Sequence, residues 1–287
     1  MAQTPDVHSS AWPPARMGWV SHVGLVSDNN EDSFICDPAL GLYAVADGMG
    51  GHAAGEVAAA VALYTLHQRV ADGESLVTAV QLAHQAVHRA AAEGLGAEGM
   101  GATVVAVRLR GPRYEVAWVG DSRAYLWNGG LHQLSHDHSF VQRLVDSGNL
   151  DEAEARAHPY RNVITQSLGA ADRDQVEVGY QRGVLLRGQW LLLCSDGLTD
   201  ELDDPALEAV LSAAPDPATA AATLLEQALA AGGHDNITIG VIAAPADAPQ
   251  TMEEARRLLQ PPRWPRLLWL AAAAAAGLLL YLWLSAP

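Results

Sequence analysis

The amino-acid sequence predicts an α+β fold built around one large domain. Short apolar segments typical of strands recur along most of the chain, and two pairs of longer helical segments interrupt them. Four of the predicted strands begin or end at an Asp, which is the third observation behind this interpretation. The chain has 287 residues, of which 49% are hydrophobic, so it is long enough to bury a sizeable core.

The predicted strands follow one another as a meander. They are expected at residues 19–23, 34–36, 42–46, 103–108, 114–119, 124–127, 176–180, 189–194 and 237–242. A turn separates 34–36 from 42–46, so we expect these two segments to pair as a hairpin. That hairpin would bring Glu31 and Asp32 close to Asp47.

The helical segments come in pairs between the strands. Their apolar patterns predict helices over residues 56–70, 74–93, 205–213 and 217–231. A further polar stretch, about 136–170, interrupts the strand pattern. Asp137 and Ser139 are good helix caps at its start, and we interpret the stretch as a mobile flap.

The composition excludes some classes of partner. The net charge of −16 argues against nucleic acid as a partner, because phosphate backbones attract basic surfaces, and it suits divalent cations.

Cys36 and Cys194 lie in apolar runs and are expected to be small buried side chains without a disulfide. His84 and His88 have the i, i+4 spacing of metal ligands but no third ligand nearby, so we expect solvated surface histidines.

The C-terminal part of the chain differs from the rest. Residues 267–284 carry no charge and would form a helix of roughly 27 Å, close to the hydrocarbon thickness of a bilayer. Several arginines precede this segment, so the positive-inside rule predicts a single-pass C-terminal anchor in the cytoplasmic membrane with the domain facing the cytoplasm. A buried helix packed on the domain is the alternative.

The domain organisation follows from these segments. We expect a disordered arm over residues 1–16, a globular domain over 17–244, a proline- and arginine-containing linker over 245–266, and the membrane segment at 267–284. Nothing at the N-terminus resembles a secretory signal.

The chemistry of the chain is predicted by the Asp residues at its strand ends. Asp47, Asp121, Asp196 and Asp235 each adjoin an apolar strand, and we expect them to converge at one end of the sheets. Scattered helix caps are the alternative. Gathered carboxylates repel one another unless divalent cations bind them, and oxygen ligands suit Mg²⁺ or Mn²⁺. Two such ions about 3.5–4 Å apart would lower the pKa of a water that attacks phosphorus.

The ordered motifs resemble those of one enzyme family. The set is Asn30-Glu31-Asp32, Asp47-Gly48-Met49-Gly50-Gly51-His52, Gly120-Asp121-Ser122-Arg123, Asp137-His138-Ser139, Ser195-Asp196-Gly197 and Asp235-Asn236. In this order and spacing it resembles the bacterial metal-dependent serine/threonine protein phosphatases of the PPM (protein phosphatase 2C-like) family. The resemblance covers about residues 17–243.

The resemblance implies a four-layer αββα sandwich, in which helices flank two antiparallel sheets and metal ions bind at one end. It also implies the catalytic group Asp32, Asp47, Asp196 and Asp235, and the metal ligands Glu31, Asp47, Gly48 (through its carbonyl), Asp121, Asp196, Asp200 and Asp235. Two Mn²⁺ or Mg²⁺ ions are expected, and a third, weaker site would use Asp121, Asp196 and Asp200. By the same resemblance, Asn236 orients Asp235 and Asp32 hydrogen-bonds a metal-bound water.

Two positions depart from the family pattern. Ser27 stands where family members usually have a phosphate-binding Arg, and a Ser cannot supply a bidentate cationic fork. We expect Arg161 or another flap residue to compensate. Met49 stands where some relatives have a His, so a metal-bound water or His52 would protonate the leaving group; a structural role is the more natural one for His52.

The expected function is the hydrolysis of phosphoserine and phosphothreonine on proteins by a metal-activated water. The enzyme would oppose a membrane Ser/Thr kinase whose phosphorylated loops and substrates lie near the same bilayer. Two alternatives remain: a weakly active or inactive pseudophosphatase that binds phosphoproteins, which Ser27 favours, and an enzyme acting on small phosphoesters.

Overall fold

The computed structural model describes residues 16–50, 54–170 and 174–259 of the chain. It divides into two units, Met1–Pro249 and Gln250–Pro287, of which the first holds both sheets. The predicted membrane segment 267–284, most of the arm 1–16 and His52 lie outside the described residues. Within the described ranges, no helix is both long and apolar enough to cross a bilayer.

Two five-stranded antiparallel sheets form the centre of the first unit. Their orders are β1-β12-β11-β8-β9 and β10-β7-β6-β3-β2, and β4 and β5 pair separately. The strands are β1 Met17–His22, β2 Ser33–Asp37, β3 Leu42–Ala46, β4 Gly48–Met49, β5 Gly101–Ala102, β6 Val104–Arg110, β7 Arg113–Val119, β8 Arg123–Trp127, β9 Leu131–Gln133, β10 Gly179–Val184, β11 Trp190–Cys194 and β12 Ile237–Ala243.

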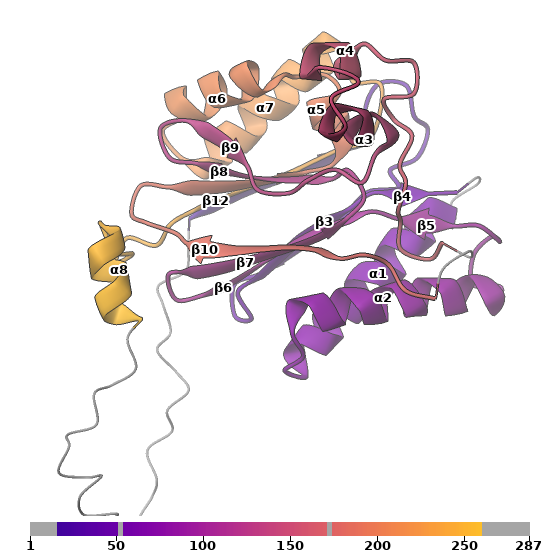
Figure 1. Ribbon diagram of the computed structural model, residues 1–287, viewed down its shortest axis with the longest axis horizontal. Helices are drawn as coiled ribbons and strands as arrows, with labels where there is room; N and C mark the ends of the chain where they lie inside the picture. The colour runs from indigo at the N-terminus through magenta and orange to yellow at the C-terminus, as the bar shows by residue number, and fades with distance from the viewer. Residues whose placement is uncertain (1–15, 51–53, 171–173, 260–287) are drawn as a thin grey trace, which may run out of the picture. The chain divides into compact units, whose positions relative to one another are not determined.

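Two pairs of helices cover the two outer faces of the sheets (Figure 1). The helices of the described residues are α1 Ala54–Ala71, α2 Leu76–Ala92, α3 Phe140–Asp146, α4 Glu152–Arg156, α5 Asp196–Thr199, α6 Asp204–Ala213, α7 Pro217–Ala231 and α8 Met252–Leu258. α1 and α2 bury small residues such as Ala58 and Ala62 against the second sheet, while α6 and α7 cover the first. The four-layer arrangement expected from the sequence is confirmed.

Three hydrophobic cores hold these layers together. One lies between α1, α2 and the second sheet, one lies between α6, α7 and the first sheet, and the third fills the space between the sheets. The alternation of side chains along each strand explains this division, because successive residues point to opposite faces. In β7, for example, Tyr114 and Val116 enter the core between the sheets, whereas Ala117 and Val119 face the helices.

The predicted hairpin is confirmed, and it positions the first acidic residues. β2 pairs with β3 so that Ser33 is opposite Ala46, one residue from Asp47. The backbone N–H of Gly48 donates to the carbonyl of Glu31 at 3.2 Å. The loop before β2 and the loop after β3 therefore meet at one end of the sheet.

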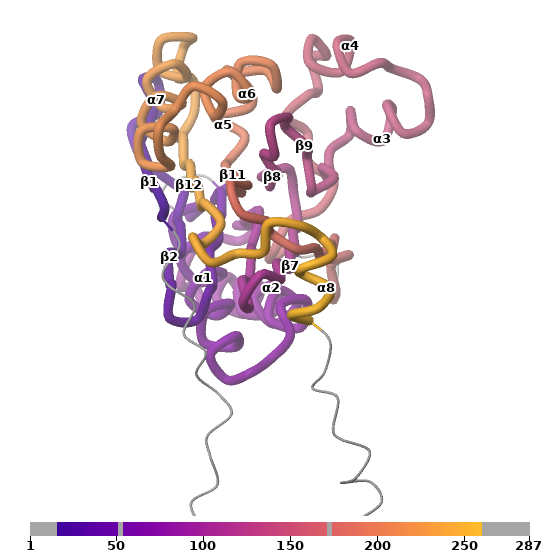
Figure 2. The backbone as a smooth tube through the Cα atoms, turned by 90° about the vertical axis from the view of Figure 1, so that its left-hand side faces the viewer, coloured from indigo at the N-terminus to yellow at the C-terminus, as the bar shows by residue number. Residues whose placement is uncertain are grey.

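The flap region also agrees with the sequence pattern. Ser139 caps α3 by accepting a hydrogen bond from Gln142 N, and Asp151 forms a capping box with Glu154 at the start of α4. Figure 2 shows α3 and α4 on the same side of the sheets as α6 and α7 but apart from those two helices.

Several sequence expectations are wrong. His84 is buried in α2, where its Nδ1 accepts the backbone N–H of Gly169 at 3.0 Å, because its side of the helix packs on the segment that returns from the flap. Cys36 is exposed, because β2 is an edge strand; Cys194 is buried as expected. The strand expected at 176–180 is β10, shifted to Gly179–Val184 by its pairing with β7. The linker over 245–266 stays a prediction: helix α8 lies within that range, and residues 260–266 are outside the described part of the chain.

Candidate metal centre

The acidic residues that follow the strands line one pocket of about 800 Å³, which we call the carboxylate pocket. It is lined by Ser27, Asp28, Asn29, Glu31, Asp47, Gly48, Met49, Gly50, Thr103, Asp121, Asn162, Ile164, Asp196, Asp235 and Asn236. β3, β7 and β11 end at this pocket and β12 begins there, which explains why residues far apart in sequence gather. The convergence expected from the sequence is confirmed, and scattered capping is excluded.

Backbone contacts fix Asp47 at the end of β3. Its N–H donates to the Thr103 hydroxyl at 3.1 Å, and its carbonyl accepts the Thr103 N–H at 2.8 Å. The Thr103 hydroxyl also lies 2.7 Å from that of Ser122, next to Asp121. This buried pair of hydroxyls connects two acidic strand ends, and the sequence analysis did not identify it.

Two glycines allow the chain to approach itself beside Asp47. A Cβ at Gly48 would lie 2.0 Å from the carbonyl oxygen of Gly55, and a Cβ at Gly55 would lie 2.2 Å from Glu31 Oε2. The Glu31 carboxylate therefore sits directly over the first turn of α1, at a position that only Gly can occupy. This packing places Glu31 beside Gly48, as the resemblance implied.

Burial and mutual repulsion raise the pKa values of these carboxyl groups. Desolvation is the largest cause for Asp47, followed by the charges of Asp196 and Asp32, and the pKa of Asp47 rises well above its usual range. Desolvation and then the charge of Asp200 raise the pKa of Asp196 to about 6. For Asp121, desolvation and then Asp196 raise the pKa strongly, and the pKa of Glu31 rises through desolvation and then Asp235.

The donor set fits divalent cations. Asp47 and Asp196 lie within hydrogen-bonding reach of each other, and the buried Oδ1 of Asp196 has no hydrogen-bond partner among the described residues. Bound cations would remove the repulsion and satisfy that oxygen. In the described ranges, no three acidic, His or Cys side chains enclose an ion as they stand. A pocket of this size leaves room for the several waters that Mg²⁺ and Mn²⁺ retain.

Asp32 lies behind the pocket rather than on its wall. It is 7% exposed, and its Oδ2 accepts the Ser195 hydroxyl at 2.8 Å while its Oδ1 has no partner among the described residues. Desolvation raises the pKa of Asp32 to about 7, and the hydrogen bonds from Ser195 and Thr238 oppose this rise. The neighbouring charges that raise it further are those of Asp196 and Asp235, so Asp32 belongs to the same group of acids.

Ser195 is a positioning residue that the sequence analysis missed. Its hydroxyl oxygen accepts the N–H of Thr238 at 3.0 Å, so its own proton is free to point toward Asp32. A small polar residue just before the Asp196-Gly197 pair was the available signal in the sequence.

Asn236 contacts Asp235, as expected, and its side chain has a second role. Its backbone N–H, and not its side chain, contacts Asp235 Oδ1 at 2.7 Å. The side-chain oxygen accepts the N–H of Glu31 at 2.6 Å, and the side-chain nitrogen donates to the carbonyls of Val23 and Asn29. Asn236 therefore holds the loop that carries Ser27 and Glu31, because its amide offers both a donor and an acceptor.

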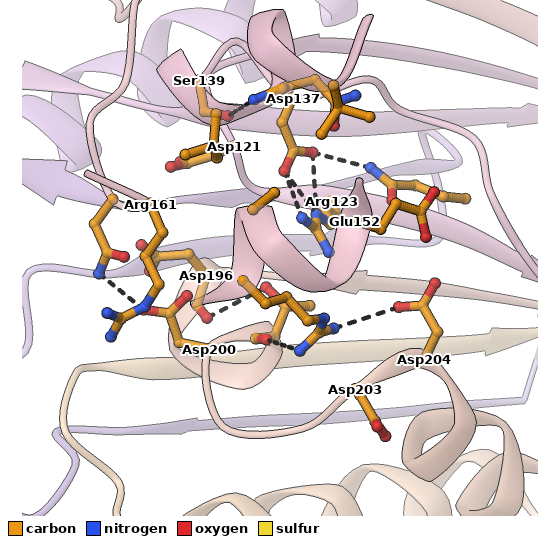
Figure 3. A pocket seen from close by; sticks show the side chains of 18 of the residues that line it. Asp121, Arg123, Asp137, Ser139, Glu152, Arg161, Asp196, Asp200, Asp203 and Asp204 are labelled. Carbon is orange, nitrogen blue, oxygen red and sulfur yellow. Dashed lines mark hydrogen bonds and ion pairs between the residues drawn. The ribbon is translucent and has the colours of Figure 1, made fainter. Parts of the chain in front are cut away.

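A second cavity of about 460 Å³, which we call the flap pocket, adjoins the carboxylate pocket and shares Asp121, Asn162 and Asp196 with it (Figure 3). Asp200 lines the flap pocket beside Asp121 and Asp196, as the expected third metal site requires. Arg123, whose role the sequence analysis did not assign, binds Asp137 through three hydrogen bonds of 2.6–3.0 Å.

Arg161 does not lie in the carboxylate pocket with Ser27. Its Nε is 3.8 Å from Asp200 Oδ2, and Asn162 donates to the same oxygen at 2.8 Å. The described lining of the carboxylate pocket contains no Arg or His, so the expected compensation by Arg161 is not present in this arrangement. Asn162 and Ile164 are the flap residues that reach the pocket.

Comparison with known proteins places this arrangement among phosphatases. The family described as Protein phosphatase 2C matches residues 25–231. The serine/threonine protein phosphatase PstP of Mycobacterium tuberculosis is 40% identical over 225 residues, 76% of this chain and 43% of PstP. The protein phosphatase PhpP of Streptococcus pneumoniae is 32% identical over 237 residues, 78% of this chain and 95% of PhpP.

A solved structure also agrees with the fold. The catalytic domain of PstP in complex with two manganese ions has a TM-score of 0.72 and 36% identity, covering 80% of this chain and 97% of that one. This chain spans less than half the length of PstP as a whole.

Proposed function

Because this chain belongs to the protein phosphatase 2C family, we propose that it hydrolyses phosphoserine and phosphothreonine on proteins with Mn²⁺ or Mg²⁺ in the carboxylate pocket. The single observation that supports this proposal most is the meeting of Glu31, Asp47, Asp196 and Asp235 in one pocket. The same proposal is supported by relatives named serine/threonine protein phosphatases and by the structure of PstP in complex with two manganese ions.

The acidic residues of this pocket would bind two ions. Asp47, Glu31, Asp196, Asp235 and the Gly48 carbonyl would hold these two ions in the carboxylate pocket. When bound, the ions supply an activated water at neutral pH and neutralise phosphate charge. A third ion would use Asp121, Asp196 and Asp200 in the flap pocket.

The chain's own side chains orient this centre and limit its substrates. Ser195 holds one oxygen of Asp32, which leaves the other available inside the acidic group. Since the described pocket lining carries no basic side chain, substrate phosphate is held through the ions and through Ser27, Asn29 and Asn162. Binding of the phosphate alone is therefore weak, and a protein substrate adds contacts outside the pocket.

The test is an assay of the purified protein on phosphothreonine peptides and on p-nitrophenyl phosphate, with and without Mn²⁺. We expect Mn²⁺-dependent release of phosphate, faster from the peptide, and its loss in Asp47→Asn. Asp72→Asn, an exposed change on another element, is the matched control. Activity without added metal after exhaustive chelation would contradict the proposal, and faster turnover of the small ester would favour the small-phosphoester alternative.

A second test, made at position 27, asks whether the protein is an enzyme or a pseudophosphatase. We expect Ser27→Arg to lower the KM for phosphopeptide by about tenfold, since an Arg at this wall of the pocket would bind phosphate with a bidentate fork. Ser33→Arg, outside the pocket, is the control. A wild type that binds phosphopeptide but gives no turnover with any metal would support the pseudophosphatase; an unchanged KM in Ser27→Arg would remove Ser27 from the argument.

We also propose that residues 267–284 anchor the chain in the cytoplasmic membrane, with the phosphatase unit facing the cytoplasm. The uncharged apolar segment and the arginines at 256, 257, 263 and 266 support this location. The partners would be phosphoproteins at that membrane, including a membrane Ser/Thr kinase that the phosphatase opposes.

A further inference from the structure

The charges of the first unit are separated between the two ends of its sheets. The carboxylate pocket lies where β3, β7 and β11 end and β12 begins. At the opposite ends of β6, β7 and β10, the charged residues are four arginines and one glutamate: Arg108, Arg110, Arg113, Arg182 and Glu115. In a protein with a net charge of −16, this local excess of positive charge is opposite in sign to the whole.

The strand registers place these five residues on one face of the sheet. Arg110 is opposite Arg113, while Arg108 and Arg182 are opposite Glu115 on either side of β7. Directly paired residues share a face. The neighbours that point the other way, such as Tyr114 and Leu109, lie in the core between the sheets. The arginines are therefore on the outer face, where Arg108 is covered by the turn between α1 and α2 and the others are exposed.

The guanidinium groups on this face repel one another. Arg110, Arg113 and Arg182 are exposed, and Arg110 and Arg182 form no ion pair within 4.0 Å with any described residue. Arg108 is 9% exposed and donates to the Glu74 carbonyl at 3.2 Å; burial and then the charge of Arg110 lower its pKa. Glu115 accepts a hydrogen bond from the Tyr180 hydroxyl. Like charges directly opposite one another destabilise a sheet, so an anionic partner would relieve a cost in the free protein.

The chain leaves the first unit beside this face. The turn between β6 and β7 is tied to the segment after β10 by a bond from Leu185 N to the Pro112 carbonyl at 2.7 Å. Two residues later, exposed Arg187 donates from its N–H to the carbonyl of Pro249 at 2.9 Å, and from its Nε to Ala248. Pro249 is the last residue of the unit. The segment that leads to residues 267–284 therefore starts at the edge of the arginine-bearing face.

We propose that this arginine face, formed by Arg110, Arg113 and Arg182 with Arg187 beside it, docks on the anionic lipid headgroups of the membrane that the C-terminal segment enters. The proposal rests on the anchoring proposed above. Guanidinium groups bind phosphate with two parallel hydrogen bonds, and basic clusters are attracted to the negative cytoplasmic leaflet within a Debye length of about 8 Å.

Docking in this way would determine which way the carboxylate pocket faces relative to the membrane. The seven residues of β7 run from Arg113 to the pocket end, a span of roughly 23 Å at 3.3 Å per residue. The pocket would open away from the headgroups and toward the cytoplasm. Residues 250–266 separate this unit from the proposed anchor, so a contact between the arginine face and the headgroups would add a constraint on the orientation of the unit.

The experiment measures which end of the full chain approaches the lipid. A Cys36→Ser protein is labelled with a fluorophore at Gln181→Cys on β10, or at Asn149→Cys between α3 and α4, both exposed positions. It is reconstituted in nanodiscs of zwitterionic lipid with or without phosphatidylglycerol, each containing lipid with a nitroxide headgroup. Turnover of a soluble phosphopeptide is measured on the same samples.

We expect phosphatidylglycerol to raise the quenching of the label at Gln181 by about twofold, with a smaller change at Asn149, and high salt to reverse it. Arg110→Glu/Arg182→Glu should abolish the rise. Arg89→Glu/Arg143→Glu, with the same change in net charge at exposed positions of α2 and α3, should retain it.

Equal quenching in both lipids, or an equal loss in both double variants, would overturn the proposal and leave this face to an acidic protein partner. A chain that fails to enter nanodiscs overturns the anchoring and the docking together. Normal quenching in an inactive protein would instead contradict the phosphatase function alone.

Discussion

At the scale of single residues, the carboxyl groups of the pocket determine how the protein responds to pH and metal. The pKa of Asp32 rises from the usual value near 3.8 to about 7 and that of Asp196 to about 6, in each case chiefly through desolvation. An acid whose pKa is raised on folding holds its proton more tightly in the folded state. The metal-free fold is therefore most favoured while these groups stay protonated.

The first prediction concerns stability against pH. Without metal, the contribution of these acids to the free energy of unfolding should fall as pH rises from about 4 to about 7, because in that window the folded state binds more protons than the unfolded state. Saturating Mn²⁺ should reverse the trend, since it replaces the protons. Denaturant melts at several pH values, with and without Mn²⁺, measure both. Asp47→Asn should show a weaker pH slope and little gain from Mn²⁺; an increase in metal-free stability from pH 4 to pH 7 would contradict the assignment.

The second prediction concerns Ser195. Ser195→Ala should lower kcat about tenfold with a small change in KM, because Asp32 loses the donor that fixes its Oδ2. The Thr238 N–H also loses its acceptor, at a cost of roughly 1–3 kcal/mol in stability. Steady-state kinetics with Mn²⁺ and thermal melts separate the two effects. Ser147→Ala, on the exposed end of α3, should change neither.

At the scale of elements, the acidic site depends on a close crossing between the loop after β3 and the first turn of α1. Gly48 and Gly55 touch through their backbones, and the Glu31 carboxylate lies over Gly55. Any side chain here would separate elements that come from different parts of the fold. The sequence patterns predicted the strand at 42–46 and the helix at 56–70 but not β4, which carries Gly48, and only the packing shows that these parts meet without space for a Cβ.

The third prediction tests this crossing. Gly48→Ala should destabilise the protein by about 2 kcal/mol, as overpacking of a tight site does, and should abolish Mn²⁺ binding. Gly130→Ala is the matched control, since a Cβ there would meet its nearest atoms at 3.8 Å, and its effect should stay within about 0.5 kcal/mol. Melting curves and Mn²⁺ titration by calorimetry provide the readout. Native-like Mn²⁺ affinity in Gly48→Ala would show that the crossing does not shape the site.

At the scale of the whole molecule, the acidic pocket and the arginine face lie at opposite ends of the same strands. The proposed anchor would have a function of its own, because tethering raises the effective concentration of substrates in the same membrane without adding contacts. With the proposed anchor, location would contribute to the choice of substrates together with the fold.

The fourth prediction compares substrates that differ only in location. The full chain in vesicles should dephosphorylate a lipid-anchored phosphothreonine peptide about a hundredfold faster than a protein of residues 1–260 does, because of the gain in effective concentration. The two proteins should act equally on the same peptide in solution. Phosphate release at low enzyme concentration is the measurement. Equal rates on the anchored peptide would argue against anchoring by residues 267–284.

The amino-acid sequence was enough to predict the class of the fold, the order of most elements and the acidic residues that meet in the pocket. Those features depend on local patterns: alternation in strands, 3.6-residue periodicity in helices, and Asp beside Gly at strand ends. The sequence pattern placed β10 three to four residues too early and treated His84 as exposed, because pairing with β7 and packing of the returning flap segment are not local properties.

The roles of residues that act through contacts distant in sequence are visible only in the three-dimensional structure. Asn236 holds the loop before β2, Ser195 holds Asp32, and Arg161 pairs with Asp200 instead of reaching toward Ser27. The separation of arginines from carboxylates also emerged only when strand register and direction were known. The physical reason is common to all of these: a side chain's partner is set by how strands pair and layers stack, and a one-dimensional pattern of residue types carries that information only in part.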